Sequence, residues 1–386
     1  MSRIYLDYNA STPCCPEALD AMLPYFREHY GNASSIHAFG QEAKGAIEEA
    51  RGKVAALLNA TRGEIVFCGG GTESDNMGVV GAARAVAAKG RHVVTSAVEH
   101  DAVRQACDAL EREGFEVTRV APEPTGRVSA DAVGAALRPD TILVSIMAAN
   151  NETGVIQPTA EIGALCAPKG IVFHVDAIQA AGKYPIDVEA WQANLVTITA
   201  HKFYGPKGAG ALYVRRGTRL APLVFGGEHE RGRRAGTENV PAIVGLGRAC
   251  EVALEAMKTS VPRMAALRDR LEAGLMASVP QIVRHGDGAP RVCNTSHLSF
   301  VGAEGELHIL SLDVKGLAVS AGSACKAGSS HPSGVLLAMG VPPAVAQAAV
   351  RFSVGRSTTD AEIDRVLEIV PPVVAKLRAS SPTFAA

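Results

Sequence analysis

The residues best suited to chemistry surround Lys202 in TAHKFYGPKG (Thr199 to Gly208), where a histidine and an aromatic residue flank the lysine. The apolar run Leu195 to Ala200 predicts a buried strand, and the proline and glycines that follow predict an irregular turn. Lys202 is therefore expected at a strand end. An amine there can form a Schiff base when desolvation favours its uncharged form, whereas most lysines are surface residues.

A second polar group stands upstream in FHVDAIQA, where the predicted strand Ile171 to Val175 ends at Asp176 and Gln179 follows. A carboxylate at a strand end can keep a heteroaromatic nitrogen protonated, which makes a ring cofactor an electron sink. The same carboxylate could cap a helix. This stretch leaves both roles open.

A third group is CGGGTESDN (Cys68 to Asn76), which follows an apolar strand and opens a helical segment. Its three glycines let the backbone approach an anion, the helix start offers unpaired N–H groups, and Thr72 adds a hydroxyl. The segment fits neither GxGxxG nor GxxxxGK[ST], so it predicts a phosphate cup of another kind.

The cup, the carboxylate and the lysine follow one another in the order typical of fold-type I enzymes that use pyridoxal phosphate. Further motifs extend the similarity over nearly the whole chain, and with them the sequence resembles the cysteine desulfurases, closest to their nitrogen-fixation (NifS) branch. The motifs are YLDYNASTP, YGNASSIHAFG, GTESDN, VEHDAV, ANNETG, HVDAIQA, TAHKFYGPKG, ERGRRAGTEN, SAGSAC and RFSVGRSTTDAEID.

This resemblance implies a role for each matching residue. Lys202 would carry the cofactor as a Schiff base, Asp176 would pair with the pyridine nitrogen, and His100 would lie over the ring. Asn151 and Gln179 would face the ring oxygen. The phosphate would be held by Gly71, Thr72, Thr199 and His201, and by Thr237 from the neighbouring subunit of a homodimer. Thr199 replaces the serine of many relatives, and either hydroxyl can donate to phosphate.

His100 follows the predicted strand Arg91 to Ser96. A histidine at a strand end is more often a hydrogen-bonded structural residue than an acid or base. Because the surrounding motifs match, we interpret His100 as a catalytic ring that stacks on the cofactor.

Cys325 differs from the other cysteines of the chain, which has eight in all and neither a CxxC pair nor zinc-site spacing. It lies in AGSACKAGSSHPSG, whose small residues predict a mobile exposed loop over about residues 320–335. Lys326 and His331 would favour its thiolate. The resemblance implies that Cys325 takes sulfur from L-cysteine, which leaves L-alanine and a Cys325 persulfide.

The implied sulfur acceptor is an iron–sulfur scaffold protein, with nitrogenase metalloclusters as the predicted destination. In relatives the loop cysteine can also ligate a transient iron–sulfur cluster shared with the scaffold, which would make Cys325 a metal ligand. Lys326 stands where relatives often carry Thr or Ser, so the preference among acceptors stays open.

An arginine is expected to bind the substrate carboxylate, because its planar fork matches two oxygens. Arg351 follows the mostly apolar run Ala344 to Val350, where a lone charge would be costly without a partner. The resemblance selects Arg351, with Asn32 and the Ala10 backbone nearby. Arg356 is the alternative.

The elements that position these residues alternate between apolar strands and helices, which predicts an α/β architecture with a mostly parallel sheet of seven strands between helices. The resemblance implies that this is the fold-type I architecture. The expected strands are Glu64–Phe67, Arg91–Thr95, Glu116–Val120, Thr141–Ile146, Ile171–Val175, Leu195–Thr199 and Ala211–Val214. Two long helices are expected over 241–257 and 262–278, and strands of a smaller α+β domain near 295–300 and 350–353. The predicted divisions are an N-terminal arm (1–15) that packs with the small domain, a large cofactor-binding domain (16–257) and a small domain (258–386).

Composition agrees with a globular protein: 386 residues, 47% of them hydrophobic, with a net charge of −1. This charge gives no electrostatic reason to expect nucleic acid or a membrane surface as a partner. The segment MSRIYLDYNA shows no apolar h-region, no apolar run reaches membrane-spanning length, and the cysteine pattern fits a reducing compartment, so we expect a soluble protein of the cytoplasm. Besides a desulfurase, the alternatives are a selenocysteine lyase or aminotransferase of the same fold and a non-catalytic scaffold, which would not need Lys202, Asp176 and His100.

Overall fold

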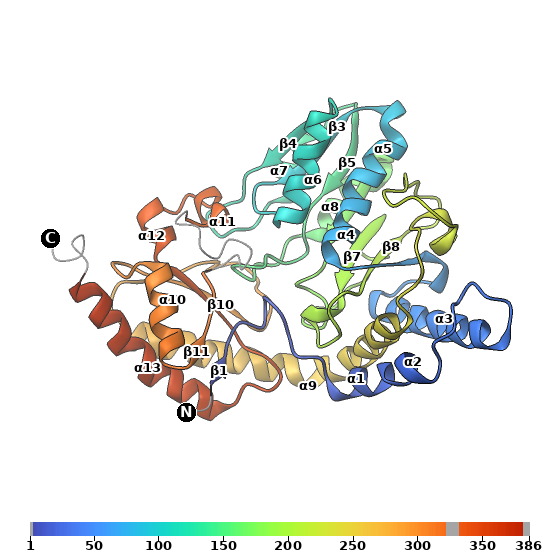
Figure 1. The fold of residues 1–386 in the computed structure, drawn as a ribbon. Coiled ribbons are helices and arrows are strands. Elements are labelled where there is room, and N and C mark those ends of the chain that lie inside the picture. The colour runs from blue at the N-terminus through green and yellow to red at the C-terminus, as the bar shows by residue number, and fades with distance from the viewer. Residues whose placement is uncertain (1–2, 322–331, 381–386) are drawn as a thin grey trace.

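The computed structural model describes residues 3–321 and 332–380, and its centre is a sheet of seven strands (Figure 1). The strands are β2 (Ile65–Cys68), β3 (His92–Ser96), β4 (Glu116–Val120), β5 (Thr141–Ser145), β6 (Val172–Asp176), β7 (Leu195–Thr199) and β8 (Gly210–Val214). Their order is β2-β8-β7-β6-β5-β3-β4. β8 is antiparallel to β2 and β7, and the other neighbours are parallel. The predicted mostly parallel sheet is confirmed, with strand bounds within one residue of expectation.

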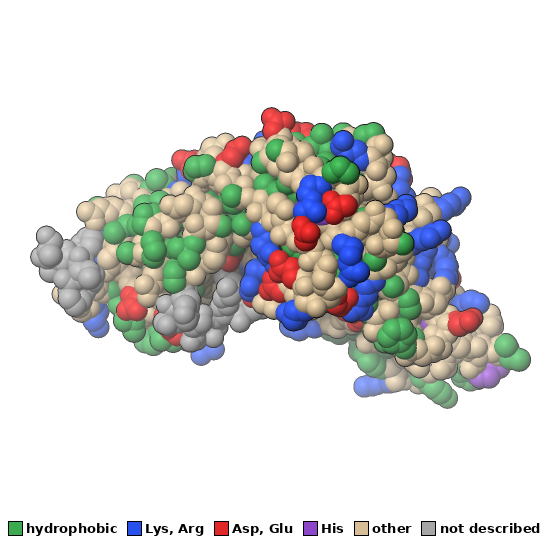
Figure 2. Space-filling view, turned by 90° about the horizontal axis from the view of Figure 1, so that it is seen from above, with side chains coloured by type: hydrophobic (Ala, Val, Ile, Leu, Met, Phe, Trp, Pro, Cys, Tyr) green, Lys and Arg blue, Asp and Glu red, His purple; other side chains and the backbone are tan. Residues whose placement is uncertain are grey.

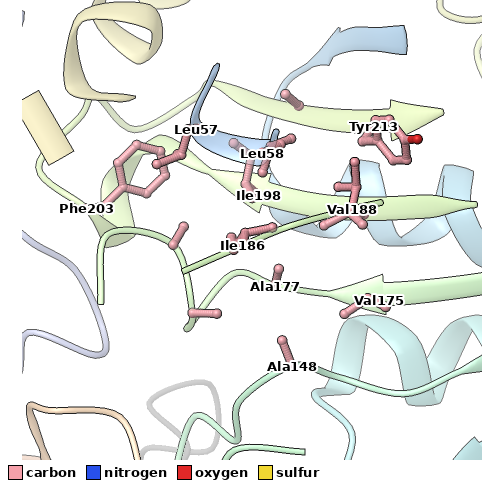
Figure 3. Close-up of a cluster of buried hydrophobic side chains, with 14 of the residues drawn as sticks. Leu57, Leu58, Ala148, Val175, Ala177, Ile186, Val188, Ile198, Phe203 and Tyr213 are labelled. Atoms are coloured by element: carbon pink, nitrogen blue, oxygen red, sulfur yellow. The ribbon is translucent and has the colours of Figure 1, made fainter. Parts of the chain in front are cut away.

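Both faces of this sheet are buried, because alternate residues of its strands belong to different hydrophobic clusters. In β3, Val93 packs in one cluster and Val94 in the other. Figure 3 shows part of the cluster that contains Val94, in which Leu57 and Leu58 lie near Ile198 of β7.

The helices of the unit that contains the seven-stranded sheet are α1 (Pro16–Met22), α2 (Pro24–Arg27), α3 (Ala38–Leu58), α4 (Gly71–Asn76), α5 (Ala82–Val86), α6 (Asp101–Arg112), α7 (Ala130–Ala136) and α8 (Thr159–Cys166). Short turns of 3₁₀ or π helix are η1 (Arg62–Glu64), η2 (Met77–Gly81), η3 (Ala87–Lys89), η4 (Ala167–Lys169), η5 (Ala200–Lys202) and η6 (His229–Gly232).

A second, smaller unit has its own sheet and hydrophobic cluster. β10 (Thr295–Phe300) pairs antiparallel with β9 (Ile282–Arg284) and β12 (Ala349–Ser353). Its helices are α10 (Gly305–Val314), α11 (Gly334–Ala338), α12 (Pro343–Gln347) and α13 (Asp360–Ala379). The N-terminal strand β1 (Ile4–Tyr5) pairs in parallel with β11 (Leu317–Ala318), and Ile4 and Leu6 enter the hydrophobic cluster of this unit.

The expectation of two helices between residues 241 and 278 is wrong, because α9 (Val240–Ser278) is a single helix with Pro262 inside it (Figure 1). A proline removes one intrahelical hydrogen bond, and packing on both sides can offset that loss. Ala253 and earlier apolar residues of α9 pack in the large-domain cluster, whereas Met264 and later ones pack in the small-domain cluster. The proposed domain boundary near residue 258 falls between these two sets.

The surface in Figure 2 carries basic and acidic side chains side by side, without a broad field of one sign on that face. In the part of the chain that the structure describes, the helices are too short or too polar to cross a bilayer.

Candidate active site

The candidate site is a cavity of ≈ 230 Å³ at the carboxyl edge of the central sheet. Parallel strands present the residues that follow them at one edge, where ligands of open α/β sheets bind. β6 ends at Asp176, β7 ends at Thr199, and Lys202 follows on η5. The lining residues are Asn9, Ala10, Gly71, Thr72, His100, Met147, Ala149, Asn151, Asp176, Ile178, Gln179, Thr199, His201, Lys202 and Arg351.

Most of the described residues that were predicted for the site line this one cavity, and Thr237 and Asn32 do not. Thr237 is exposed, in the segment that precedes α9. Asn32 is exposed as well, and its side-chain oxygen accepts a hydrogen bond from the Ser34 N–H at 2.9 Å. Cys325 lies outside the described residues. The roles of these three residues stay predictions.

The amine of Lys202 is held by the N-terminal arm. It donates to the carbonyl oxygens of Asn9 at 2.7 Å and Ala10 at 2.9 Å. The Asn9 side chain also donates to Thr295 Oγ1 at 2.8 Å, which links the cavity to the small domain. Sequence reasoning missed Asn9, although it stands in YLDYNASTP directly before the predicted site residue Ala10.

Asp176 is nearly buried and lines the cavity from the end of β6. Its Oδ1 accepts a hydrogen bond from the Ile178 N–H at 2.9 Å, so the carboxylate also closes the turn that follows the strand. The two roles left open by the sequence therefore coexist. Burial raises the pKa of Asp176, and His100, the Ile178 N–H and Lys202 act in the opposite direction.

His100 combines a structural contact with a place in the cavity. Its Nδ1 accepts a hydrogen bond from the Ala102 N–H at 3.1 Å and caps α6. A ring nitrogen that accepts carries no proton, so the proton of the neutral imidazole is assigned to Nε2.

A buried polar cluster that the sequence did not reveal lies behind Asp176. His174 shares the Asp176 face of β6, because side chains two apart in a strand point the same way. Its Nε2 is 3.6 Å from Asp75 of α4, and its Nδ1 is 2.9 Å from Ser145 Oγ. Burial lowers the pKa of His174 to about 3. Burial, and then the charge of Asp176, raise the pKa of Asp75 well above its usual range, which favours the protonated form of this acid.

Glu99 is a second buried acid near Asp176. It accepts hydrogen bonds from Ser96 Oγ at 2.6 Å and from the Met147 N–H at 3.0 Å. Burial raises the pKa of Glu99 to about 8 against these two hydrogen bonds, and the charge of Asp176 adds to the rise. Of these three acids, Asp176 is the one that lines the cavity.

A glycine-lined hollow adjoins the cavity and shares Ala10, Gly71, Thr72, Thr199 and His201 with it. Its remaining lining residues are Ser11, Gly69, Gly70, Glu73, Lys207 and Gly208. The Thr199 hydroxyl donates to the Ala209 carbonyl oxygen at 3.1 Å, so a bond from this hydroxyl to phosphate would replace that contact. Burial lowers the pKa of His201 to about 4, and nearby lysines add to this effect.

Arg351 reaches the cavity from β12 with 2% of its surface exposed. Its terminal nitrogens donate to the Asn151 carbonyl oxygen at 2.7 Å and to Asp7 Oδ1 at 2.8 Å. The alternative, Arg356, is stacked on the ring of Tyr204 at 4.2 Å and does not line the cavity.

These residues fit pyridoxal phosphate. The cavity offers an amine, a carboxylate and an imidazole, and the glycine hollow beside it carries Lys207 and backbone groups suited to an anion. The buried side-chain oxygen of Asn151 has no hydrogen-bond partner among the described residues, which indicates that a polar ligand group belongs there.

The fold and the cavity define the site of a fold-type I enzyme. A comparison with known families shows to which family the chain belongs. The model described as Aminotransferase class-V matches residues 4–366, so the chain belongs to the class-V aminotransferase family.

Relatives match over nearly the full length. A cysteine desulfurase of Trichormus azollae is 48% identical over 382 residues, which cover 99% of this chain and 95% of the relative. A cysteine desulfurase IscS of Anaeromyxobacter dehalogenans is 51% identical over 384 residues, with the same two coverages. A solved structure of a NifS-like protein superposes with a TM-score of 0.90 at 36% identity, over 97% of this chain and 100% of that one. The predicted resemblance and fold class are confirmed.

Proposed function

We propose that this chain is a pyridoxal-phosphate-dependent cysteine desulfurase that converts L-cysteine to L-alanine and passes the sulfur to a protein acceptor. The observation that carries the proposal is the meeting of Lys202, Asp176, His100 and Arg351 in one cavity beside a glycine-lined hollow. The full-length relatives named as cysteine desulfurases support it. Bound pyridoxal phosphate supplies an electron sink for the carbon next to the substrate amine.

Residues of the chain would bind the substrate and move its protons. Arg351 binds the substrate carboxylate, and Asp176 holds the positive charge of the cofactor nitrogen. Lys202, the residue that would hold the cofactor, is placed to take the proton from the substrate Cα. His100 stands beside the reacting groups with its Nε2 proton free of the helix cap.

The sulfur step needs a thiolate, which the sequence assigns to Cys325. The Cys325 sulfur attacks the substrate sulfur, so that an S–S bond forms as the substrate C–S bond breaks. The carbon product gains protons and leaves as L-alanine, and Cys325 keeps the persulfide. Other thiols are poor candidates, because burial raises the pKa of Cys68, Cys107 and Cys166 to about 12.

Further parts of the proposal concern the assembly. We infer a homodimer in which the exposed Thr237 reaches the phosphate of the neighbouring subunit. The acceptor would be an iron–sulfur scaffold protein, with Cys325 as a transient cluster ligand. The NifS resemblance favours nitrogenase metalloclusters as the destination, and sulfur transfer from isotope-labelled cysteine to purified scaffolds of each kind would test this.

A product and persulfide assay tests the proposed reaction. The holoenzyme is incubated with L-cysteine, the products are measured, and the Cys325 peptide is weighed. We expect L-alanine and a peptide heavier by one sulfur atom. Cys325→Ser should lose turnover, whereas Cys14→Ser, a half-buried cysteine elsewhere, should keep it. A keto-acid product would indicate an aminotransferase. Undiminished turnover of cysteine or selenocysteine by Cys325→Ser would indicate a lyase.

A further inference from the structure

Lys183 is a buried amine behind the wall of the cavity. It stands in the turn that follows β6, and 7% of its surface is exposed. Its Nζ donates to two oxygens of a single residue, the side-chain Oε1 of Gln179 at 2.9 Å and the Gln179 carbonyl oxygen at 3.3 Å. Gln179 lines the cavity, so the Lys183 amine contacts the site through this one side chain.

The contact with Lys183 fixes which end of the Gln179 amide faces the site. A lysine ammonium can donate hydrogen bonds but cannot accept them, so the amide oxygen must turn toward Nζ. The amide nitrogen then points the other way and donates to the Asn9 carbonyl oxygen at 3.0 Å. The same carbonyl accepts the hydrogen bond from Lys202 at 2.7 Å. The second N–H of Gln179 is left for a hydrogen-bond acceptor in the cavity.

Packing alone does not explain a lysine at this position. Removing an amine from water costs free energy, and a methionine of similar length would fill the space without that cost. Burial lowers the pKa of Lys183 to about 7. Cys293 acts against this shift, whereas the charges of Lys202 and Arg351 add to it. Even the uncharged amine keeps two N–H groups, one for each oxygen of Gln179.

We propose that Lys183 is a positioning residue that orients the Gln179 amide so that its N–H is directed at the ring oxygen of the bound cofactor. This inference rests on the proposed function, because it needs pyridoxal phosphate in the cavity. Without Lys183 the amide loses the donor that holds its oxygen and can rotate, which presents an oxygen to another oxygen.

The test is a double-mutant cycle between positions 183 and 179. Lys183→Met, Gln179→Leu and the double variant are prepared as apoproteins and titrated with pyridoxal phosphate at about pH 6, where the amine is charged and can only donate hydrogen bonds. We expect Lys183→Met to weaken cofactor binding by about fivefold, the worth of one hydrogen bond. The absorbance spectrum of the bound cofactor should change with it. Both changes should be clearly smaller when Lys183→Met is added to Gln179→Leu.

A conservative variant keeps the test decisive if Lys183→Met does not fold. Lys183→Gln retains an N–H donor and should bind pyridoxal phosphate within about twofold of the unmodified protein. Equal losses in both position-179 backgrounds, or wild-type affinity and spectrum in Lys183→Met, would overturn the inference. Failure of the unmodified protein to bind pyridoxal phosphate would instead refute the proposed function, so the two failures are distinguishable.

Discussion

Arg351 and Asp7 form an ion pair of 2.8 Å across the cavity wall, although they stand at opposite ends of the chain. Because Arg351 also donates to the Asn151 carbonyl oxygen, both terminal nitrogens of the guanidinium are anchored. The plane of the fork is therefore set before a substrate arrives, which reduces the entropy lost on binding.

The first prediction concerns the substrate carboxylate. Arg351→Lys keeps a positive charge but loses the planar fork, so the KM for L-cysteine should rise about tenfold or more. Arg356→Lys is the matched control, because Arg356 stacks on Tyr204 outside the cavity and should leave KM within about twofold. Steady-state kinetics of alanine release would check both. An unchanged KM in Arg351→Lys would exclude Arg351 from carboxylate recognition.

The second prediction separates two buried acids. Asp176→Asn should lower kcat by roughly 10²–10³, since an amide cannot balance the positive charge of the cofactor nitrogen. Asp75→Asn should change kcat by no more than about threefold, because burial and the charge of Asp176 raise the pKa of Asp75 and favour its protonated form. The amide resembles the protonated acid in shape. A loss in Asp75→Asn as deep as that in Asp176→Asn would show that Asp75 acts as an anion.

The third prediction is a pH dependence of stability from Glu99. Its pKa is about 8 in the folded protein and about 4.3 in an unfolded chain. Between these values the folded state holds a proton that the unfolded state has released, so this group's contribution to stability falls as the pH rises. The slope is at most about 1.4 kcal/mol per pH unit.

Glu99→Gln should remove this contribution. Thermal unfolding between pH 5 and pH 8 should show a smaller loss of stability in Glu99→Gln than in the unmodified protein. The exposed Glu255→Gln serves as control and should follow the unmodified protein. Parallel pH profiles for all three proteins would contradict the assignment of a proton to Glu99.

The fourth prediction tests the glycine hollow through its packing. A Cβ added at Gly210 would lie 2.7 Å from the carbonyl carbon of Gly70, in the loop that lines the hollow. Gly210→Ala should therefore displace that loop, at a cost of about 1–3 kcal/mol, and weaken pyridoxal phosphate binding. Gly45→Ala, at an exposed helix position with open space around it, should bind the cofactor normally. Equal affinities measured by fluorescence titration would argue against Gly210 as support for the phosphate loop.

The sequence by itself determined the central sheet and most of the cavity lining. Strong apolar runs end at Asp176 and Thr199, and parallel strands bring their ends to one edge, so local pattern was enough to gather these residues. It failed at Pro262, where a local rule for helix breaking was overridden by packing of α9 on two cores. Three predicted roles stay predictions. Cys325 lies outside the described residues, the role of Thr237 needs a second subunit, and Asn32 does not line the cavity.

The tertiary structure alone decided the partners of the site residues. The Asn9 carbonyl oxygen accepts from Lys202, which is 193 positions away in the sequence, and Asp7 pairs with Arg351, 344 positions away. Local sequence patterns cannot predict contacts between residues so far apart in the chain. The raised pKa values of Asp75 and Glu99 arise from desolvation, and the amide orientation at Lys183 arises from donor geometry. Both are properties of the packed interior, so only the folded chain could reveal them.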